Sequence, residues 1–513
     1  APPEFYSAER ERIWSLPLAM EGILLNLRTP TFTVCLLVVV GYFRARHKFF
    51  ARQFRQTDIE YVAGQINVDP TAVISSTYSK GTYVRHQEMI LLHFGYRPFD
   101  GTAKTAIANE MAALVRVQSR PKLVLLEGIQ MLTREKVALP SYNVLADLTV
   151  AAIDHHHALL LKTVNDDLSK TQRDQLDALL EKGPDNGDGE GWRYHLTLLK
   201  KANQSTQPSK IKANLADMDT LQALYLDLKP VVERLGLGYG HTRHYAYTVI
   251  KAQIPQVSRR SDNDCYLHLI AFIAYQTFKL NDTLTDTLLG VVQAATNAAL
   301  KDQKETYFKA REQHRQSLAT LVEQLRQNVH GALDAIRQIV ADGQLGDNQK
   351  LALISAALDT EDATPAQVDR HIDGFKQGVA ELQHSQDYLT RLEAHSLKLQ
   401  HRAADIVRRI QFAPDCNKPA LWEALRHYQK SDGNPDKGAP TGFLSTEQCA
   451  ALTGPDGKFR ISLYKALLFV GVAQAIKSGA LNLIHSEKYR SLGEYLIPKA
   501  DRAANRADYQ HRA

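Results

Sequence analysis

The sequence predicts an all-α protein built from several helical domains in series. Long segments at residues 123–136, 144–164 and 318–340 repeat apolar residues at intervals of three and four, the spacing of an amphipathic helix. Alternating β-branched segments bounded by Gly-Asn turns, which are typical of antiparallel strands, are nearly absent. The chain has 513 residues, 44% hydrophobic and 23% charged, which is enough for three or four globular domains of about 150 residues each.

Charge and cysteine usage narrow the class of protein. A net charge of +6 permits nucleic-acid binding but does not argue for it, because only clustered charge does so. The cysteines form no CxxC pair, which disfavours a disulfide framework or a thiolate zinc site and fits a reducing compartment; they are Cys35, Cys265, Cys416 and Cys449. The apolar run Val34 to Val40 has, with its flanks, about half the ~20 residues of a membrane span, and predicts a core helix. We expect a cytoplasmic protein that contacts no membrane and no small-molecule substrate.

Loop-rich segments divide the chain. Polar stretches at 183–191, 203–209 and 431–442 mark boundaries, and the first two flank a short helix. Residues 302–340 indicate one long helix or a helix pair. The domains that we expect are three helical domains at 1–100, 101–182 and 216–300, a linker with a short helix at 183–215, a long-helix region at 301–430, and a final helical region at 431–513.

The first segment with a candidate function is 41–56, GYFRARHKFFARQFRQ. Five basic residues alternate there with five aromatic residues, and no acidic residue is present. Aromatic side chains can anchor such a segment in a core while the basic groups reach phosphates. A solvated basic helix face is the equally good alternative. The candidate DNA-binding residues are Arg44, Arg46, Lys48, Arg52 and Arg55.

The next stretch, 58–88, has the pattern of a helix-turn-helix motif. Ala63 and Gly64 would let a second helix approach closely, residues 67–70 make a turn, and Pro70 would begin the helix that enters the major groove. A plain helical corner is the alternative. The side chains expected to face DNA are Thr71, Ser75, Ser76, Tyr78, Lys80 and Arg85.

A second candidate corner lies at 125–153. One helix is expected to end near 134–136, Pro140 breaks it, and Ser141 opens the next helix. Polar side chains and free N–H groups at a helix start suit phosphate contact. A capped corner between two helices, with Ser141 near the cap, is the alternative. The candidate DNA-binding residues are Arg134, Lys136, Ser141, Tyr142 and Asn143.

The third candidate segment, 239–260, has four basic residues and no acidic one. Its candidate DNA-binding residues are His241, Arg243, His244, Lys251, Arg259 and Arg260. The two histidines are spaced as metal ligands can be, but no nearby cysteine or carboxylate supports a metal site. Asp282 and Asp286 share a helix face as a catalytic pair would, yet capping at a helix start explains Asp282 more simply. We predict no catalytic residue and no metal ligand.

Six segments, taken together, resemble transposases of the Tn-three family of replicative, cointegrate-forming bacterial transposons. They occur in the family's order and run nearly from end to end of the chain. They are FYSAERERIWSLP (5–17), TPTFTVCLLVVVGYFRARHKFF (29–50), LPSYNVLADL (139–148), SRRSDNDCYLHLIAFIAYQ (258–276), LNDTLTDTLLGVVQAATNAA (280–299) and SLYKALLFVGVAQAIKSGALNLIHSEKYRSLGEYLIPK (462–499).

The resemblance implies a bacterial, nucleoid-associated protein whose helical domains at 1–100, 101–182 and 216–300 bind the terminal inverted repeats of a transposon as double-stranded DNA. It also implies a homodimer formed through the long-helix dimerisation and linker region at 301–430, and an RNase H-like (DDE) domain in which two Asp and one Glu hold Mg²⁺. The motifs of that domain, which look like SSDGQ, TDTAG and WEH, are absent from this sequence. A two-metal nuclease needs such converging carboxylates. We therefore expect this chain to lack the catalytic domain, to need no cofactor and to cut no DNA alone.

Within that expectation, most basic side chains would position the protein on phosphates, while Thr71, Ser75 and Asn143 are better suited to base edges. Two alternatives stay open: a truncated regulator that binds transposon ends without cutting them, and a helical scaffold that has no role on DNA.

Overall fold

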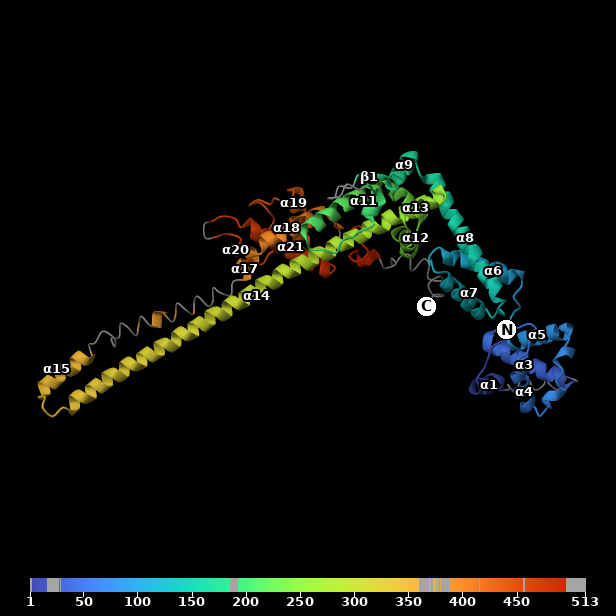
Figure 1. The fold of residues 1–513 in the computed structure, drawn as a ribbon, viewed down its shortest axis with the longest axis horizontal. Helices are drawn as coiled ribbons and strands as arrows, with labels where there is room; N and C mark the ends of the chain where they lie inside the picture. Colours follow the sequence, from blue (N-terminus) through green and yellow to red (C-terminus); the bar gives the residue numbers. More distant parts are fainter. Residues whose placement is uncertain are drawn as a thin grey trace. The chain divides into compact units, whose positions relative to one another are not determined.

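A computed structural model gives the fold of the chain (Figure 1). It describes residues 2–15, 27, 29–184, 192–358, 388–414, 416–454 and 457–494, with single positions at 369, 372–374, 376 and 379. In that part the regular structure is helical apart from one two-stranded antiparallel sheet, so the predicted all-α class is confirmed. The chain divides into unit 1, Ala1–Leu198 with Leu224–Tyr275, and unit 2, Leu199–Ala223 with Gln276–Ala513.

Unit 1 contains most of the elements before residue 276. Its helices, 3₁₀ turns and strands are α1 (Ser7–Trp14), α3 (Pro30–Arg46), α4 (Gln56–Gln65), η2 (Pro70–Ala72), η3 (Ser75–Thr77), α5 (Lys80–Phe94), α6 (Gly101–Val115), α7 (Pro121–Arg134), α8 (Tyr142–Asp167), α9 (Lys170–Leu179), β1 (Lys182–Pro184), β2 (Trp192–Tyr194), α12 (Tyr239–Lys251) and α13 (Ile254–Ser258). The helices α10 (His195–Leu199), α11 (Pro208–Leu235) and α14 (Asp262–Ala341) each contribute residues to both units.

The α3 helix is the centre of the N-terminal part of unit 1. Residues 34–43 are all buried, which is expected of a helix that is apolar on every side. One face packs against Trp14 and α4, and the opposite face packs against α5. At Gly41 a Cβ atom would collide with the indole of Trp14, so only glycine allows this packing. The prediction of a core helix at Val34 to Val40 is confirmed.

A second core joins α6, α7 and α8 in a three-helix bundle. Ile107 and Met111 from α6 meet Val124 from α7 and Leu145 from α8, and all four side chains are buried. Gly128 faces Met111 so closely that a Cβ would overlap its methyl group. Glycine therefore sets the separation between α6 and α7.

Among the described residues one helix, α8, passes a length and composition test for a membrane span. The mean hydropathy of its most apolar window is 1.2, and 22% of that window is buried. Core helices of globular domains pass the same test, and α8 buries Leu145, Thr149 and Ala152 in the bundle. One such helix is weak evidence for a span.

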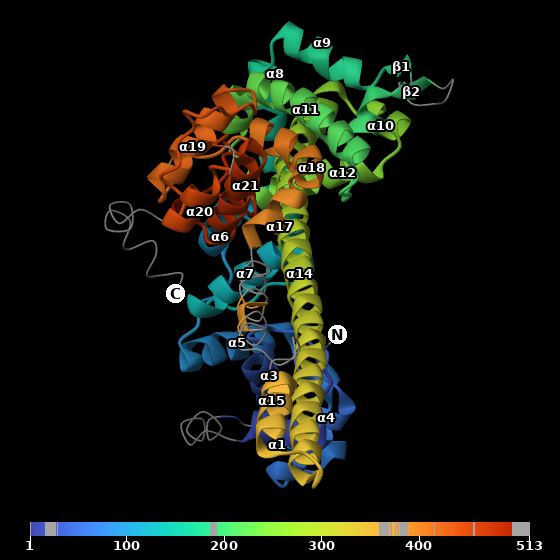
Figure 2. The ribbon, with the colours of Figure 1, turned by 90° about the vertical axis from the view of Figure 1, so that its left-hand side faces the viewer.

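Unit 2 is built around α21, which packs against α17, α18 and α19 (Figure 2). Ten residues of α21 are buried, with Tyr464 and Phe469 among the largest fully buried side chains. The helices of this unit after α14 are α15 (Asp347–Leu358), α17 (Tyr388–Ala394), α18 (Ser396–Arg409), α19 (Pro419–Lys430), α20 (Thr446–Ala451), α21 (Ile461–Lys477) and the 3₁₀ turn η5 (Leu492–Glu494).

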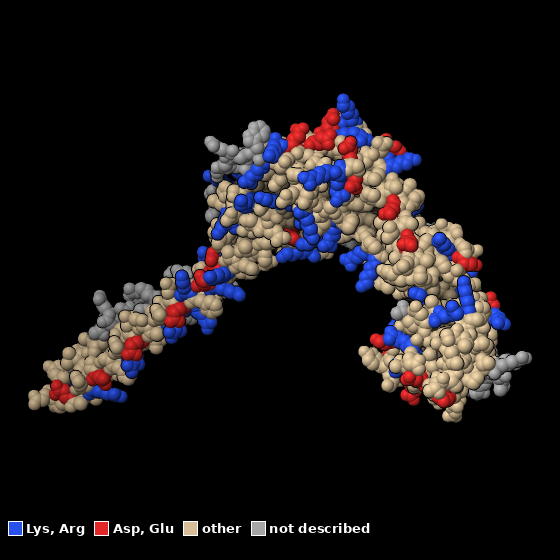
Figure 3. Space-filling model, turned by 45° about the vertical axis from the view of Figure 1, so that its right-hand side comes forward, with Lys and Arg blue, Asp and Glu red and all other residues tan. Residues whose placement is uncertain are grey.

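The α14 helix has 80 residues. The sequence predicted a long helix or a helix pair at 302–340; the structure has one helix there, which begins 40 residues earlier, at Asp262. From about residue 302 onward most side chains are exposed. Acidic and basic side chains alternate along this arm (Figure 3), and neighbouring turns are joined by pairs such as Arg315–Glu312 and Arg326–Glu323, each at 2.7 Å.

The predicted loop segments agree in part with the structure. The short α10 helix lies between the first two, as expected, and residues 431–442 form turns. The first segment overlaps β1 at 183–184, and residues 185–191 lie outside the described part of the chain.

Asp282 and Asp286 hold the segment 486–489 against α14. Asp282 accepts hydrogen bonds from the Ser486 hydroxyl and from the backbone N–H of Lys488 at 3.3 Å. Asp286 accepts from the Lys488 ammonium and the Tyr489 hydroxyl, both at 2.6 Å. The interpretation of Asp282 as a helix-start residue is wrong, because α14 begins 20 residues before it.

We expect Asp282→Ala to destabilise unit 2 by about 1–3 kcal/mol, since the fully buried Ser486 hydroxyl loses its acceptor. Burial raises the pKa of Asp282 and the hydrogen bonds from Ser486 and Lys488 oppose that rise. Urea denaturation of the full chain measures the loss. The more exposed Asp286→Ala is the control; if it destabilises the chain as much as Asp282→Ala, the buried hydroxyl is not the reason.

Candidate nucleic-acid interface

Three of the five basic residues in the first segment bind other parts of unit 1. The Arg44 guanidinium donates to the backbone oxygens of Ile13 at 2.7 Å and Ser15 at 2.6 Å, and so satisfies carbonyls at the end of α1. Arg52 and Arg55 make comparable contacts, Arg52 with the Tyr78 carbonyl at 3.0 Å and Arg55 with Glu4 at 2.7 Å. Arg44 and Arg55 are half-buried anchors of the fold, in contrast to the predicted phosphate contacts, whereas Arg52 is exposed and DNA contact there stays a prediction.

The other two basic residues of that segment face outward. Arg46 is exposed in the last turn of α3, and the half-buried Lys48 has its ammonium 5.5 Å from the Phe50 ring centre. For these two residues DNA contact stays a prediction.

The predicted helix-turn-helix motif is wrong in its second helix. Pro70 begins a 3₁₀ turn, a second 3₁₀ turn follows, and α5 starts only at Lys80 with Ser79 as its N-cap. Tyr78 does not face outward: it is fully buried, and its hydroxyl lies 2.6 Å from Nδ1 of His86. Gly64 meets open space, so it does not serve a close helix approach. The other five predicted contact residues of this motif are exposed: Thr71, Ser75, Ser76, Lys80 and Arg85.

The corner between α7 and α8 has the predicted form. The α7 helix ends at Arg134, and Ser141 caps α8 by accepting the backbone N–H of Val144 at 3.4 Å. Because a capped corner explains this geometry in full, it adds nothing in favour of DNA contact. The candidate residues Arg134, Lys136, Tyr142 and Asn143 are exposed, as is Ser141.

The third segment forms α12, α13 and the loop before α14, and two of its six candidates are not available. His241 is buried, with 4% of its surface exposed, so the prediction of DNA contact is wrong there. Arg260 is held by Asp264 at 2.7 Å, and that carboxylate already neutralises its charge. The remaining four are exposed: Arg243, His244, Lys251 and Arg259.

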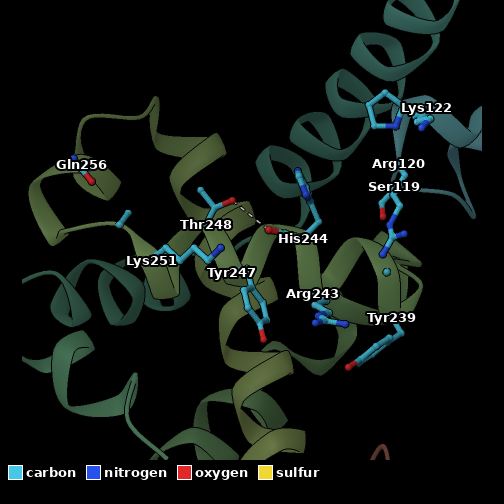
Figure 4. Close-up of a pocket in the computed structure, with 13 residues that line it drawn as sticks. Ser119, Arg120, Lys122, Tyr239, Arg243, His244, Tyr247, Thr248, Lys251 and Gln256 are labelled. Carbon is cyan, nitrogen blue, oxygen red and sulfur yellow. Dashed lines mark hydrogen bonds between the residues drawn. The ribbon is translucent and has the colours of Figure 1, made fainter. Parts of the chain in front are cut away.

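A groove brings α12 together with the chain that enters α7. It has a volume of about 960 Å³ and lies between the 119–122 segment and α12 (Figure 4). Gly240 permits the close approach, because a Cβ there would stand 3.3 Å from the Ser119 hydroxyl. The residues lining it are Ser119, Arg120, Pro121, Lys122, Tyr239, Gly240, Arg243, His244, Tyr247, Thr248, Lys251, Ala252 and Gln256.

Basic groups dominate the groove. Arg120, Lys122, Arg243 and Lys251 line it, and none of the described lining residues is acidic. The pKa of Arg243 is raised above its usual value, first by its hydrogen bond with Tyr247. Two helices, α7 and α12, begin at the groove without a side-chain cap, which leaves positive helix-dipole ends there. The groove is therefore suited to a polyanion.

Sequence reasoning found Arg243, His244 and Lys251 but missed the 119–122 side of the groove. The two sides are more than 100 residues apart, so no spacing rule joins them. One signal in the sequence pointed to the α12 side of the groove. Four residues there follow at intervals of four and hence share one face of a helix: Tyr239, Arg243, Tyr247 and Lys251.

A buried histidine on α12 lies beside a half-buried histidine on α8. His241 on α12 and His156 on α8 have ring centres 5.6 Å apart, and His241 is hydrogen-bonded to the backbone of Val115 near the 119–122 segment. Nδ1 of His241 and Nε2 of His156 find no hydrogen-bond partner among the described residues. Burial lowers the pKa of both rings, and the charges of Arg116, His155, His157 and His244 act in the same direction.

We expect the thermal stability of unit 1 to fall as the pH drops below about 6.5. Because the pKa of each ring is lower in the folded chain, the unfolded chain takes up protons first as the pH falls, and stability is fully present above the unfolded pKa. Melting curves between pH 8 and pH 5 measure this, and the fall should be shallower in His156→Gln/His241→Gln. The exposed His155→Gln is the control; an equal change in that variant would contradict the assignment.

Among the described residues, no group of three or more His, Cys, Asp and Glu side chains is arranged to hold a metal ion.

One comparison with known protein families gives a match. The model of a family described as a domain of unknown function (DUF4158) matches residues 1–152. The match covers α1 to α7 and the start of α8, and so includes the 119–122 side of the groove but not α12.

Proposed function

We propose that this chain binds double-stranded DNA, with the groove between α12 and the 119–122 segment holding the phosphates of the duplex. The observation that carries the proposal is a set of four basic side chains with no described acidic neighbour in the lining. Phosphates are the polyanion that such a surface and two open helix starts recognise. Exposed cations at Arg46, Arg85 and Lys136 would add phosphate contacts elsewhere in unit 1.

The class of DNA comes from the sequence resemblance. The six segments similar to Tn-three family transposases support the terminal inverted repeats of a transposon as the bound sequence, and a place for this chain in a replicative transposition complex. A mobility-shift titration tests this with a duplex copied from the ends of the element that encodes the chain, against a scrambled duplex of equal length. Tighter binding of the terminal duplex is expected; equal binding would leave a DNA-binding protein without that specificity.

Salt dependence tests the phosphate contacts separately. Four neutralised phosphates would lower the affinity by on the order of 100-fold between 50 and 200 mM salt. An affinity for duplex DNA that stays constant over this range would mean that the groove does not bind phosphates.

We further propose that the α14 arm joins two copies of the chain. Val322, Leu325 and Val329 are exposed and follow the 3–4 spacing of a coiled-coil seam, while the charges around them are paired within the helix. Sedimentation of Leu325→Glu/Val329→Glu is expected to show monomers where the unaltered chain shows dimers. A dimer that survives these charges is formed by another surface.

A further inference from the structure

The α12 face in the groove has an alternating pattern of aromatic and cationic side chains. Tyr239, Arg243, Tyr247 and Lys251 are each four residues apart, and all four line the groove. Tyr247 is the third of these residues, and a basic side chain lies one turn away on either side of it (Figure 4).

Tyr247 contacts both cations. The guanidinium carbon of Arg243 lies 5.1 Å from the centre of the Tyr247 ring, and the ammonium of Lys251 lies 5.8 Å from it. Both distances are within the range of a cation–π interaction. A hydrogen bond also joins the Tyr247 and Arg243 side chains.

Tyr247 is itself held from behind. Tyr275, in the first part of α14, packs edge-on against it with ring centres 5.7 Å apart, and their side chains are hydrogen-bonded. Tyr275 also lies 6.4 Å from the Tyr239 ring. Three tyrosines from α12 and α14 thus form a backing for the basic side chains.

This arrangement changes the cost of binding an anion. An exposed Arg or Lys samples many rotamers and loses side-chain freedom when a ligand immobilises it. Arg243 and Lys251 already rest on one aromatic ring, so part of that cost is met before the ligand arrives. Arg260, 17 positions after Arg243, is instead paired with the carboxylate of Asp264, which offsets its charge.

We infer that Tyr247, supported by Tyr275, is a positioning residue that presents Arg243 and Lys251 to the phosphates of a bound duplex. The inference deepens the proposed function and rests on it for the identity of the ligand. Tyr247 contacts no phosphate in this account; it acts through the two cations.

A double-mutant cycle on the full chain tests the inference by fluorescence anisotropy with a duplex. Tyr247→Phe removes the hydroxyl and keeps the ring, and we expect it to weaken binding about three- to tenfold, the range of one hydrogen bond. In an Arg243→Ala background the same change should have less than about a twofold effect, because its partner is gone. An equal effect in both backgrounds would overturn the inference, since a merely structural tyrosine behaves that way.

Two controls make the result specific. Tyr194→Phe alters a tyrosine that also lies under a lysine, at 5.3 Å from Lys182, but lies outside the groove, and should leave the affinity unchanged. Thermal melting should show that Tyr247→Phe is folded at the temperature of the binding assay, although it loses its hydrogen bond with Tyr275.

Elution from immobilised heparin separates this inference from the proposed function. Tyr247→Phe should elute at lower salt than the unaltered chain even if the chain proves to have no affinity for duplex DNA. In that outcome the proposed function fails and the positioning of the cations stands. Identical elution of both proteins would overturn the positioning role.

Discussion

Replacing Arg243 and Lys251 together by glutamate is expected to weaken duplex binding by at least about 100-fold at 0.1 M salt. Each phosphate contact contributes roughly a factor of ten at this salt concentration through counterion release, and a reversed charge also repels the phosphate that its predecessor bound. Both side chains are exposed in the groove, so the double variant should fold as the unaltered chain does. A mobility-shift titration gives the affinities.

The matched control places the same two charge changes on the α14 arm, as Lys309→Glu/Arg311→Glu. Both residues are exposed and lie outside the groove. This control separates a local effect of the groove from the general effect of a lower net charge. If both double variants lose the same affinity, DNA is attracted by the charge of the whole chain and the groove has no special role.

Asp58→Ala is expected to destabilise the N-terminal part of unit 1 by about 3–5 kcal/mol, the range for breaking a buried ion pair. Asp58 is fully buried and accepts from the Arg10 guanidinium and the Tyr42 hydroxyl, each at 2.9 Å. Removing the carboxylate leaves a buried hydroxyl and a largely buried cation without their acceptor. Hydrogen exchange in α3 should accelerate by more than about 100-fold, since that free energy corresponds to two or more orders of magnitude in the opening equilibrium.

The control for this variant is Glu60→Ala. Glu60 lies on the same helix, α4, two residues further on, and is exposed. Its removal should leave exchange in α3 unchanged. If hydrogen exchange in α3 is as slow in Asp58→Ala as in the unaltered chain, the buried pair contributes little to stability. The apolar contacts of α3 are then enough to keep this part of unit 1 folded.

Local signals in the sequence predicted local structure well. The apolar run at Val34 to Val40 became a buried helix, and the Pro140-Ser141 pair became a helix break followed by a cap. Pro70 predicted the start of the second helix, but it begins a 3₁₀ turn and α5 starts at Lys80. Ser79 is the better start signal, since its hydroxyl accepts the backbone N–H of Thr82 at 3.1 Å.

Tertiary partners explain the remaining differences. A basic segment without acidic residues indicates that no sequence neighbour neutralises the charge of its arginines. It does not indicate whether those arginines donate to backbone carbonyls elsewhere in the fold. Arg44 meets the end of α1, some 30 residues away, and this contact turns a candidate DNA residue into an anchor. His241 was predicted as a DNA contact because it lies in a basic segment without acidic residues, yet α12 turns it toward His156 and Val115.

Arg120 and Lys122 show the opposite case. They lie with Arg116 in a short basic stretch without acidic residues, 116–122, which was not predicted as a DNA contact, and this stretch becomes significant because α12 packs beside the 119–122 segment. Thr71, Ser75 and Asn143 are exposed, and their role in reading bases stays a prediction.

Ultraviolet cross-linking of a bound duplex, followed by mapping of the adducts to peptides, tests most directly where the DNA lies. We expect adducts in peptides that contain residues 119–122 and 239–256, with Tyr239 and Tyr247 as the reactive aromatic side chains nearest the phosphates. Adducts confined to the α14 arm, with none in either of these two peptides, would contradict the assignment of the groove.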